Sequence, residues 1–383
     1  MLRRARSAGA RIAWAVALAC GLVAPSARAQ QPKSAQQTVD KQVDPVREDK
    51  AAGDWIALPV LYYSPETLLA GGAVGIYYFR LPGSDKETRA SNIKGDFIYT
   101  MRQQFLAQMS PQFYFDDEKY FLDTDFSYVR FFDRYWGVGN NTPDSAQEEY
   151  TSDTIRGRVG LLRRLPPYAN FGPRLHVEEF TLREFERGKL IDTDPTVIGA
   201  RESLITGFGV EFQYDSRDNY FSATTGSYVS AQALVFTRTL GGTATYLRYT
   251  LDARRFFPTW RGQVLAIQGY FNAVTSGVPF TSLAQLGGIN LSRGIFDGRY
   301  RDLLAAVVQA EYRVPIYWRF GVVGFAALGE VSSSLTGFTF KGIHPSGGGG
   351  VRFLLKEDER IFLRADVGFG SAASFYFTAN EAF

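Results

Sequence analysis

The sequence is poor in the residues on which most enzymatic and metal-binding chemistry depends. Its 383 residues include one cysteine, Cys20, and two histidines, His176 and His344. One cysteine cannot form an internal disulfide, and a structural zinc site draws most of its ligands from Cys and His. A Ser–His hydrolase site would need a histidine beside a nucleophile, and no serine-containing motif accompanies either histidine. We therefore expect a protein that is not an enzyme and that holds no metal and no cofactor.

Long apolar segments are scarce as well. Beyond the first thirty residues, no run approaches the about 18 apolar residues typical of a transmembrane helix. The chain does contain many aromatic residues, at 15% of the total, and 38 glycines. This mixture is typical of many short strands joined by frequent turns.

Residues 1–29 are predicted to be a cleaved export signal. Arg3, Arg4 and Arg6 form a basic start, residues 12–24 are apolar, and residues 27–29 (Ala-Arg-Ala) fit a small-x-small cleavage site. A membrane anchor is the alternative, but the apolar stretch is shorter than the about 20 residues that a spanning helix needs. Lipid attachment at Cys20 is a further alternative, which Ala17 disfavours because the attachment motif prefers Leu at that position.

Removal of the signal changes the charge of the chain. The first 29 residues hold five arginines and no acidic residue, so the formal net charge falls from +3 to −2. The remaining charge gives no reason to expect a nucleic-acid partner. Residues 30–53 are polar and almost free of aromatics, which predicts a disordered periplasmic arm too short to fold alone. Residues 54–383 form the remaining region.

In this region, stretches of about ten residues alternate apolar and polar side chains, which is typical of strands with two different faces. In the clearest stretch, Arg364 and Asp366 alternate with a row of apolar residues, namely Ile361, Leu363, Ala365, Val367 and Phe369. A soluble sandwich would also alternate. Rows of charges such as Arg248, Asp252 and Arg254 instead favour a water-filled lumen with the apolar face turned to lipid.

Aromatic residues gather near the predicted strand ends, as they do in the interfacial girdles of membrane barrels. These residues are Tyr62, Tyr63, Tyr77, Tyr78, Phe256, Phe257 and Trp260. We therefore predict an all-β fold, a transmembrane antiparallel β-barrel in the outer membrane of a Gram-negative bacterium.

The number of alternating segments predicts sixteen strands. They are placed near residues 55–63, 68–80, 91–101, 104–115, 119–130, 150–164, 171–186, 203–215, 227–239, 243–256, 261–274, 302–313, 318–331, 347–356, 360–370 and 373–383. An even-stranded barrel has long loops outside and short turns in the periplasm. The three longest connections, 131–149, 187–202 and 275–301, all fall on the extracellular side of this assignment.

The segment between the eighth and ninth predicted strands carries a recognisable pattern of turn-forming residues. Tyr214, Asp215, Arg217, Asp218 and Asn219 are followed by Gly226. Asp and Asn side chains bond their own backbone in tight turns. The pattern resembles the turn signature of the BamA/TamA-type barrels, also called bacterial surface antigens, although Ala223 stands where that family has proline. In the family this signature marks a periplasmic turn.

A second pattern lies in the long loop before the twelfth predicted strand. Ser292-Arg293-Gly294-Ile295 is similar to the Val-Arg-Gly-Phe motif at the tip of the sixth extracellular loop of the same family. The resemblance implies that this loop folds into the lumen and that Arg293 pairs with an acidic residue, Glu311. The family's other acidic position is Ala327 here. Alternation places Asp366 on the lumen face, so we expect Asp366 to take that role.

Two further expectations come from the resemblance. Phe383, the last residue of the sequence, resembles the terminal signal by which outer-membrane barrels are recognised for insertion, and Phe375 and Phe377 precede it in the last predicted strand. Family members that assemble or secrete proteins carry periplasmic polypeptide-transport domains before the barrel. Only residues 30–53 stand there in this sequence, so a minimal member of the family is expected.

The resemblance implies a barrel that assists insertion or translocation of polypeptide or lipid. The alternatives are a passive or gated pore and a structural barrel that oligomerises or scaffolds envelope proteins. The expected partners are outer-membrane lipid including lipopolysaccharide, the barrel-assembly machinery during biogenesis, and a client polypeptide or lipid. The sequence does not choose among these functions.

Overall fold

The computed structural model of the protein describes residues 53, 55–82, 90–357 and 360–383. The predicted export signal, residues 1–29, lies outside the described residues. The predicted arm, residues 30–53, also lies outside them apart from Gly53. The described part therefore covers mainly the region that was predicted to form the barrel.

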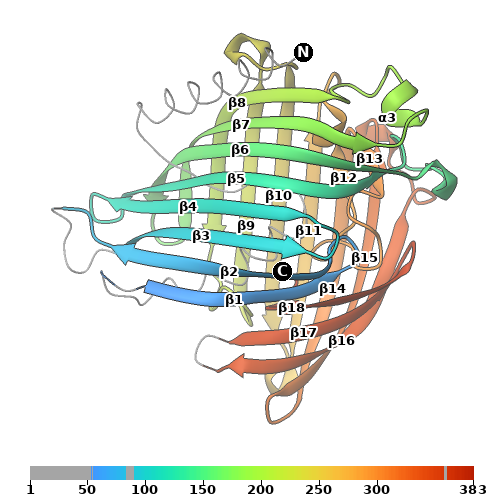
Figure 1. Ribbon diagram of the computed structural model, residues 1–383. Helices are drawn as coiled ribbons and strands as arrows, with labels where there is room; N and C mark the ends of the chain where they lie inside the picture. The colour runs from blue at the N-terminus through green and yellow to red at the C-terminus, as the bar shows by residue number, and fades with distance from the viewer. Residues whose placement is uncertain (1–52, 54, 83–89, 358–359) are drawn as a thin grey trace.

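Sixteen antiparallel strands close into one barrel, which confirms the predicted fold class and strand number. Each strand pairs with its neighbours along the chain, and the last lies beside the first (Figure 1). The barrel strands are β1 (Trp55–Ser64), β2 (Leu68–Phe79), β3 (Ser91–Thr100), β4 (Phe105–Phe115), β5 (Tyr120–Tyr135), β6 (Glu148–Leu165), β7 (Ala169–Phe185), β8 (Glu202–Asp215), β9 (Gly226–Phe236), β10 (Tyr246–Pro258), β11 (Val264–Val274), β14 (Leu304–Tyr317), β15 (Phe320–Ser332), β16 (His344–Lys356), β17 (Ile361–Phe369) and β18 (Ala373–Ala379).

The connections differ in length at the two rims of the barrel. The rim at which β1 starts and β18 ends carries mostly short connections of two to five residues, with longer ones at 80–90 and 216–225, and we call it the turn rim. The opposite rim, the loop rim, carries the long connections 136–147, 186–201 and 275–303. The last of these joins β11 to β14 and is called loop 6 here. It contains a small two-stranded sheet of β12 (Ala284–Leu286) and β13 (Tyr300–Asp302).

Helical segments are few and short in the part of the chain that the structure describes. They are α3 (Leu190–Thr193) and the 3-10 turns η2 (Asp144–Ala146), η3 (Arg238–Leu240), η4 (Trp260–Gly262), η5 (Phe280–Ser282) and η6 (Leu335–Gly337). Within the described ranges, none of the helices has the length and apolar character needed to cross a membrane.

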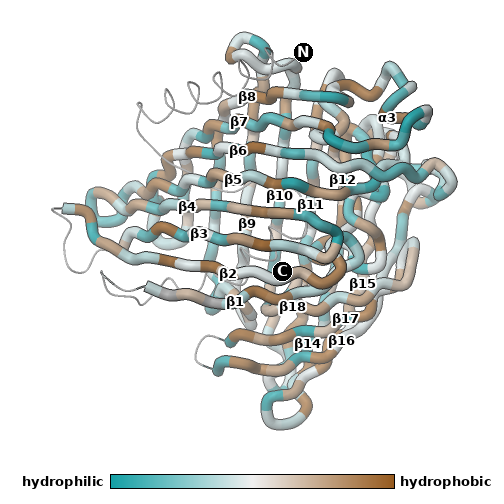
Figure 2. The backbone as a smooth tube through the Cα atoms, viewed as in Figure 1, coloured by the Kyte–Doolittle hydropathy of each residue, from teal (hydrophilic) through white to brown (hydrophobic). Residues whose placement is uncertain are grey.

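The strands have two faces because successive side chains of a strand point to opposite sides. Leu61, Leu251 and Val308 point outwards and are 55%, 42% and 60% exposed. Gln309 and Glu311 point inwards and are buried. Apolar and polar residues therefore alternate along the strands (Figure 2). The apolar face suits lipid, and the lumen is lined by polar and charged groups, as expected for a membrane barrel.

The same alternation corrects part of the predicted aromatic girdle. Tyr77, Phe257 and Trp260 are exposed on the outside, as predicted. Their neighbours Tyr78 and Phe256 face inwards and are buried, and so is Tyr62; the prediction that these three belong to the girdle is wrong. Two consecutive strand residues cannot both face the membrane.

The predicted end of the last strand is also wrong. The prediction extended this strand to residue 383, but β18 ends at Ala379. Asn380 has a φ of 65°, in the left-handed region, which turns the chain out of the strand. Residues Asn380–Phe383, which we call the tail segment, are all buried.

Candidate functional site in loop 6 and the barrel seam

The tip of loop 6 is a compact turn. The Gly288 N–H donates to the Ile295 carbonyl at 2.9 Å, and the Ser292 N–H donates to the Gly288 carbonyl at 3.1 Å. Gly287 has a φ of 130°, and a side chain there would meet the Phe296 carbonyl oxygen 2.0 Å away. Glycine is therefore required where the loop turns into the barrel.

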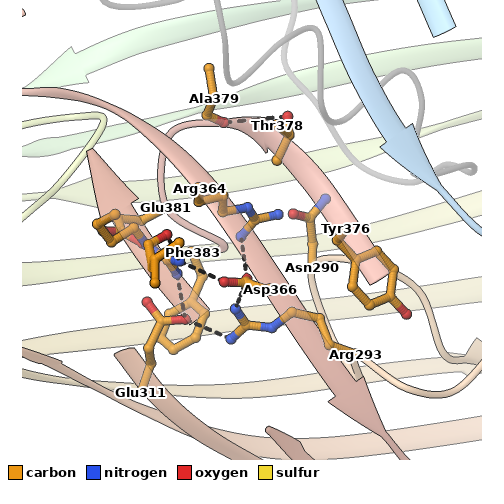
Figure 3. A network of polar contacts seen from close by, with 12 residues as sticks. Asn290, Arg293, Glu311, Arg364, Asp366, Tyr376, Thr378, Ala379, Glu381 and Phe383 are labelled. Atoms are coloured by element: carbon orange, nitrogen blue, oxygen red, sulfur yellow. Dashed lines mark hydrogen bonds and ion pairs between the residues drawn. The ribbon is translucent and has the colours of Figure 1, made fainter. Parts of the chain in front are cut away.

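Arg293 lies at this tip, among the inward-facing side chains of the barrel (Figure 3). Its Nη2 atom is 2.6 Å from Glu311 Oε2, and its Nη1 atom is 2.6 Å from Asp366 Oδ2. The guanidinium group also lies over the Phe325 ring, 3.5 Å from its centroid. A planar guanidinium can hold two carboxylates with separate nitrogens. The structure thus brings Arg293, Glu311 and Asp366 together, and Ala327, on β15, has no group that could join them.

Gly294 brings the loop tip onto the backbone of the last hairpin. Its N–H donates to the Tyr376 hydroxyl at 3.0 Å, and its carbonyl accepts from the Ala372 N–H at 3.1 Å. Its φ is 102°, and a Cβ there would lie 2.5 Å from the Phe369 carbonyl carbon. Sequence reasoning did not find Tyr376, although alternation with Phe375 and Phe377 places it on the lumen face.

Three further arginines surround the two carboxylates. Arg313 Nε is 2.8 Å from Glu311 Oε1, and Arg352 Nη1 is 2.5 Å from Asp366 Oδ1. Arg364 is more distant, with Nη1 3.9 Å from Asp366 Oδ2. All of these side chains are buried, so water screens their charges little. Alternation predicts that they point into the lumen, but it does not tell which of them meet.

The residues of the turn signature lie at the turn rim, at the end of β8 and in residues 216–225. Arg217 pairs with Asp215, with Nη2 2.6 Å from Oδ2. The Tyr214 ring packs edge to face against Tyr168 of the preceding turn, with centroids 6.0 Å apart. These contacts are local, and they fix the course of the chain as it leaves β8.

The second half of this turn contacts another turn. Asp218 accepts from the Thr224 N–H at 2.9 Å and pairs with Arg360, between β16 and β17, at 2.5 Å. Partial burial would raise the pKa of Asp218, but the hydrogen bonds from Thr224 and Arg360 hold it at about 2. Asn219 accepts from two following backbone N–H groups. Gly226 has a φ of 97°, and a Cβ there would meet a carbonyl oxygen 2.2 Å away.

Phe383 lies inside the barrel rather than on its outer surface. It is 5% exposed and packs in a small apolar cluster with Ala382, Ala223, Phe256 and Ala266. Ala223 belongs to the turn that carries the signature, so this turn and the tail segment meet. The role of Phe383 as an assembly signal stays a prediction, since it concerns the chain before it folds.

The seam between β1 and β18 is the weakest junction of the described barrel. β1 pairs with β2 along its whole length. Along the described residues, β1 pairs with β18 only at Tyr63 and Phe377. Pro59, in the middle of β1, has no N–H and is of a type tolerated in edge strands. Much of one edge of β1 is therefore left without a strand partner.

Loop 6 also touches the hairpin that contains the seam strand β1. Glu66, in the turn between β1 and β2, is buried and accepts from the Asp297 N–H at 3.2 Å. Burial, and secondly the nearby carboxylate of Asp297, raise the pKa of Glu66 to about 7. Its protonation therefore changes near neutral pH, at a contact between loop 6 and the seam.

This pKa predicts that loop 6 is held more tightly in acid. A carboxyl whose pKa is raised on folding contributes its full stability at pH values below its pKa in the unfolded chain. For Glu66 this stability is lost as the pH rises through about 7. Cleavage of loop 6 by an added protease should be at least about tenfold faster at pH 8 than at pH 5, when scaled to cleavage of the unfolded chain. Glu66→Gln should remove this dependence. If loop 6 cleavage depends on pH in the same way in the unchanged protein and in Glu66→Gln, Glu66 is not the group responsible.

Comparisons with known proteins agree with this geometry. The Omp85 superfamily domain matches residues 90–355. Among solved structures, BamA from Haemophilus ducreyi lacking POTRA domains 1–3 has a TM-score of 0.62 and 12% identity, over 86% of this chain and 71% of that chain. CdiB from Acinetobacter baumannii has a TM-score of 0.51 and 12% identity, over 85% of this chain and 59% of that chain.

CdiB from Escherichia coli has a TM-score of 0.57 and 11% identity, over 86% of this chain and 64% of that chain. The chain thus spans less than two thirds of either CdiB chain. At these identities the likeness shows the fold alone. No curated protein matches the chain.

Proposed function

The chain belongs to the Omp85 superfamily, and from that premise we propose that it lies in the outer membrane and assists the insertion or translocation of polypeptide or lipid. In this proposal the turn rim faces the periplasm and the loop rim faces the outside. The proposed partners are outer-membrane lipid including lipopolysaccharide, a client polypeptide or lipid, and the assembly machinery that inserts the barrel itself.

The observation that carries the proposal is the seam. Unpaired backbone N–H and C=O groups are costly inside a bilayer, because no water is present to bond them. The free edge of β1 therefore offers hydrogen bonds to an incoming strand, which is how an exposed sheet edge recruits a new strand. A client that enters as an extended strand would gain these bonds as it leaves water.

The filled lumen supports the same proposal over a permanently open pore. The tip of loop 6 places the buried residues Ile289, Ser292 and Arg293 between the barrel walls. The tail segment occupies the lumen close to the turn rim. A solute would have to displace both of these segments, whereas a strand that enters at the seam would not.

The proposal predicts that preventing β1 and β18 from parting stops the activity, because a client strand enters where the seam opens. Cysteines at Tyr63 and Phe377, which are register partners across the seam, would join β1 to β18 by a disulfide, with Cys20 changed to Ser. The reduced protein in liposomes should speed the folding of an added unfolded barrel protein, read as its heat-modifiable gel mobility. The oxidised protein should lose this effect.

A matched control carries cysteines at Ala231 and Leu251, which are register partners within β9 and β10. Oxidation of this control should leave the activity unchanged. If reduced protein folds the client no faster than empty liposomes do, the insertion proposal is wrong. A pore or a structural role would then be the better proposal.

A further inference from the structure

Two adjacent turns on the turn rim carry the same pair of residues, a tryptophan followed by an arginine. The turn between β10 and β11 contains Trp260 and Arg261. The turn between β14 and β15 consists of Trp318 and Arg319. Because β11 pairs with β14, these two turns are neighbours on the rim. Two pairs of an indole ring and a guanidinium group therefore lie close together.

Both tryptophans are largely exposed, Trp260 at 67% and Trp318 at 73%. The φ angles of Arg261 and Trp318 are 54° and 50°, in the left-handed region, where glycine or asparagine fits with less strain. The tight turns therefore do not account for the large side chains of Arg261 and Trp318. Most of each indole ring is left to contact the surroundings of the barrel.

Each arginine lies over the tryptophan of its own turn. The Cζ atom of Arg261 is 4.1 Å from the centre of the Trp260 ring, and that of Arg319 is 5.6 Å from the centre of the Trp318 ring. Arg319 Nη1 also donates to the Leu355 carbonyl at 3.3 Å. A guanidinium that stacks on a ring keeps most of its N–H groups, which point outwards in its plane, for an acceptor.

A third arginine lies on the outer face of β10. Arg255 is the register partner of Ile267 on β11, and its side chain is exposed. Its Nη1 atom donates to Ser227 Oγ at 2.8 Å, and its Cζ atom is 5.4 Å from the centre of the Phe257 ring. A charge on the lipid face is unfavourable, although the cost falls towards the membrane interface. An anionic acceptor beside Arg255 would lower this cost further.

In the part of the chain that the structure describes, none of these three arginines forms an ion pair. On the opposite part of the turn rim, by contrast, Arg164 pairs with Glu118 at 2.5 Å. The three unpaired charges border exposed apolar side chains of the outer face, namely Phe257, Tyr312, Ile316 and Phe320. Positive charge next to an apolar surface complements a molecule that has an anionic head and hydrocarbon chains.

We propose that this part of the turn rim binds an anionic phospholipid of the surrounding membrane leaflet. We call it the Trp–Arg patch, and it consists of Arg255, Trp260, Arg261, Trp318 and Arg319. The arginines hold the phosphate, and the indole rings lie at the level of the headgroups, where tryptophan is enriched in membrane proteins. The acyl chains run along the apolar side chains of β10 to β15. The inference rests on the proposed placement of the barrel in the outer membrane and involves no client.

Brominated lipids test the patch, because a bromine atom quenches the fluorescence of an indole ring that it contacts. All proteins carry Trp55→Phe, so that Trp260 and Trp318 are the exposed tryptophans of the described chain, since Trp136 is buried. The protein is placed in phosphatidylcholine bilayers that contain either brominated phosphatidylglycerol or brominated phosphatidylcholine. Phosphatidylglycerol should bind at least about tenfold more tightly, because each arginine beside an anionic headgroup contributes about fivefold.

Substitutions in the patch should remove this preference. Arg261→Gln should lower it about fivefold, and Arg261→Lys should lower it less, because lysine keeps the charge. The triple variant with Gln at Arg255, Arg261 and Arg319 should bind both lipids about equally. The matched control, Arg164→Gln with Tyr168→Ala, removes an arginine and an exposed aromatic from the turn between β6 and β7. It should keep the full preference.

Heat-modifiable gel mobility identifies the folded barrels, on which alone binding is compared. If the unchanged protein binds both lipids equally, or if the triple variant keeps the preference, the patch is not a site for anionic lipid. Loss of the preference on addition of inorganic phosphate would show that the arginines take free phosphate instead of a lipid. If neither lipid quenches the fluorescence, the turn rim lies outside the membrane interface, and the proposed placement of the barrel is wrong as well.

Discussion

Arg293→Ala is expected to release loop 6 from the lumen and to leave the barrel folded. Removing one member of a buried ion pair commonly costs about 3–5 kcal/mol, because the partner charge is left unpaired. Here the cost is smaller, since Glu311 keeps Arg313 and Asp366 keeps Arg352. The substitution therefore weakens the binding of loop 6 in the lumen and leaves the barrel folded, because the hydrogen bonds between the barrel strands do not involve Arg293.

Even about 2 kcal/mol would change the open fraction of loop 6 about thirtyfold. Protease added to cells should cleave loop 6 faster by about this factor, and the conductance of the protein in a planar bilayer should rise. Arg293→Lys is the informative control, because lysine keeps the charge but offers one nitrogen where Arg293 uses two. The cleavage rate and the conductance of Arg293→Lys should lie between those of the unchanged protein and those of Arg293→Ala. Unchanged cleavage and conductance in Arg293→Ala would show that Arg293 does not hold the loop.

Exchanging the charges should restore little. An arginine introduced at position 311 would lie beside Arg313, 2.8 Å from the present carboxylate, and near Arg352, at 3.8 Å. The combination Arg293→Glu with Glu311→Arg therefore places like charges together. Alternation alone does not reveal these two neighbours, because it does not tell which lumen-facing side chains meet.

The barrel strands could be predicted because each one carries its own information. A strand between lipid and lumen must alternate apolar and polar residues, and this period is visible within ten residues of sequence. The members of the aromatic girdle are harder to predict, because Tyr77 and Tyr78 are the same residue type. Only their alternate positions along the strand tell which one faces the membrane. Applying the alternation strictly would have assigned Tyr78 and Phe256 to the lumen.

The end of β18 also left a signal in the sequence. Phe375, Phe377 and Ala379 occupy outward positions, and a straight continuation would turn Glu381 towards lipid. A carboxylate on the lipid face is unfavourable. The inward turn at Asn380 removes this conflict and gives Glu381 a partner in Arg352.

The contacts within the charge cluster around Glu311 and Asp366 could not be predicted from the sequence. Alternation places Arg313, Arg352 and Asp366 on lumen faces, but each comes from a different strand. Which of them meet depends on the stagger and tilt of the closed barrel, which no single segment encodes. Asp366 was found as a partner of Arg293 because the family resemblance had already reduced the question to one missing carboxylate.

Gly294→Val is expected to expel the tip of loop 6 at least as strongly as Arg293→Ala. A side chain at this φ of 102° is strained whatever the space around it. Its Cβ would also lie 2.5 Å from the carbonyl carbon and 2.7 Å from the nitrogen of Phe369. These are backbone atoms of β17, and they cannot move away without breaking the ladder that β17 forms with β18. Overpacking of this kind costs about 1–3 kcal/mol, in addition to the strain.

The substitution would also remove the backbone contacts that tie loop 6 to the last hairpin, from Gly294 to Tyr376 and from Ala372 to Gly294. Loop 6 should be cleaved by protease at least about thirtyfold faster than in the unchanged protein. Adding Arg293→Ala should increase cleavage little further, because both changes release the same tip. Gly277→Val is the matched control: Gly277 lies in loop 6 with a φ of 79°, and a Cβ there would meet no neighbouring atom within 4 Å. If the two valine variants are cleaved equally fast, backbone strain alone explains the effect, and the close approach of Gly294 to β17 does not hold the loop.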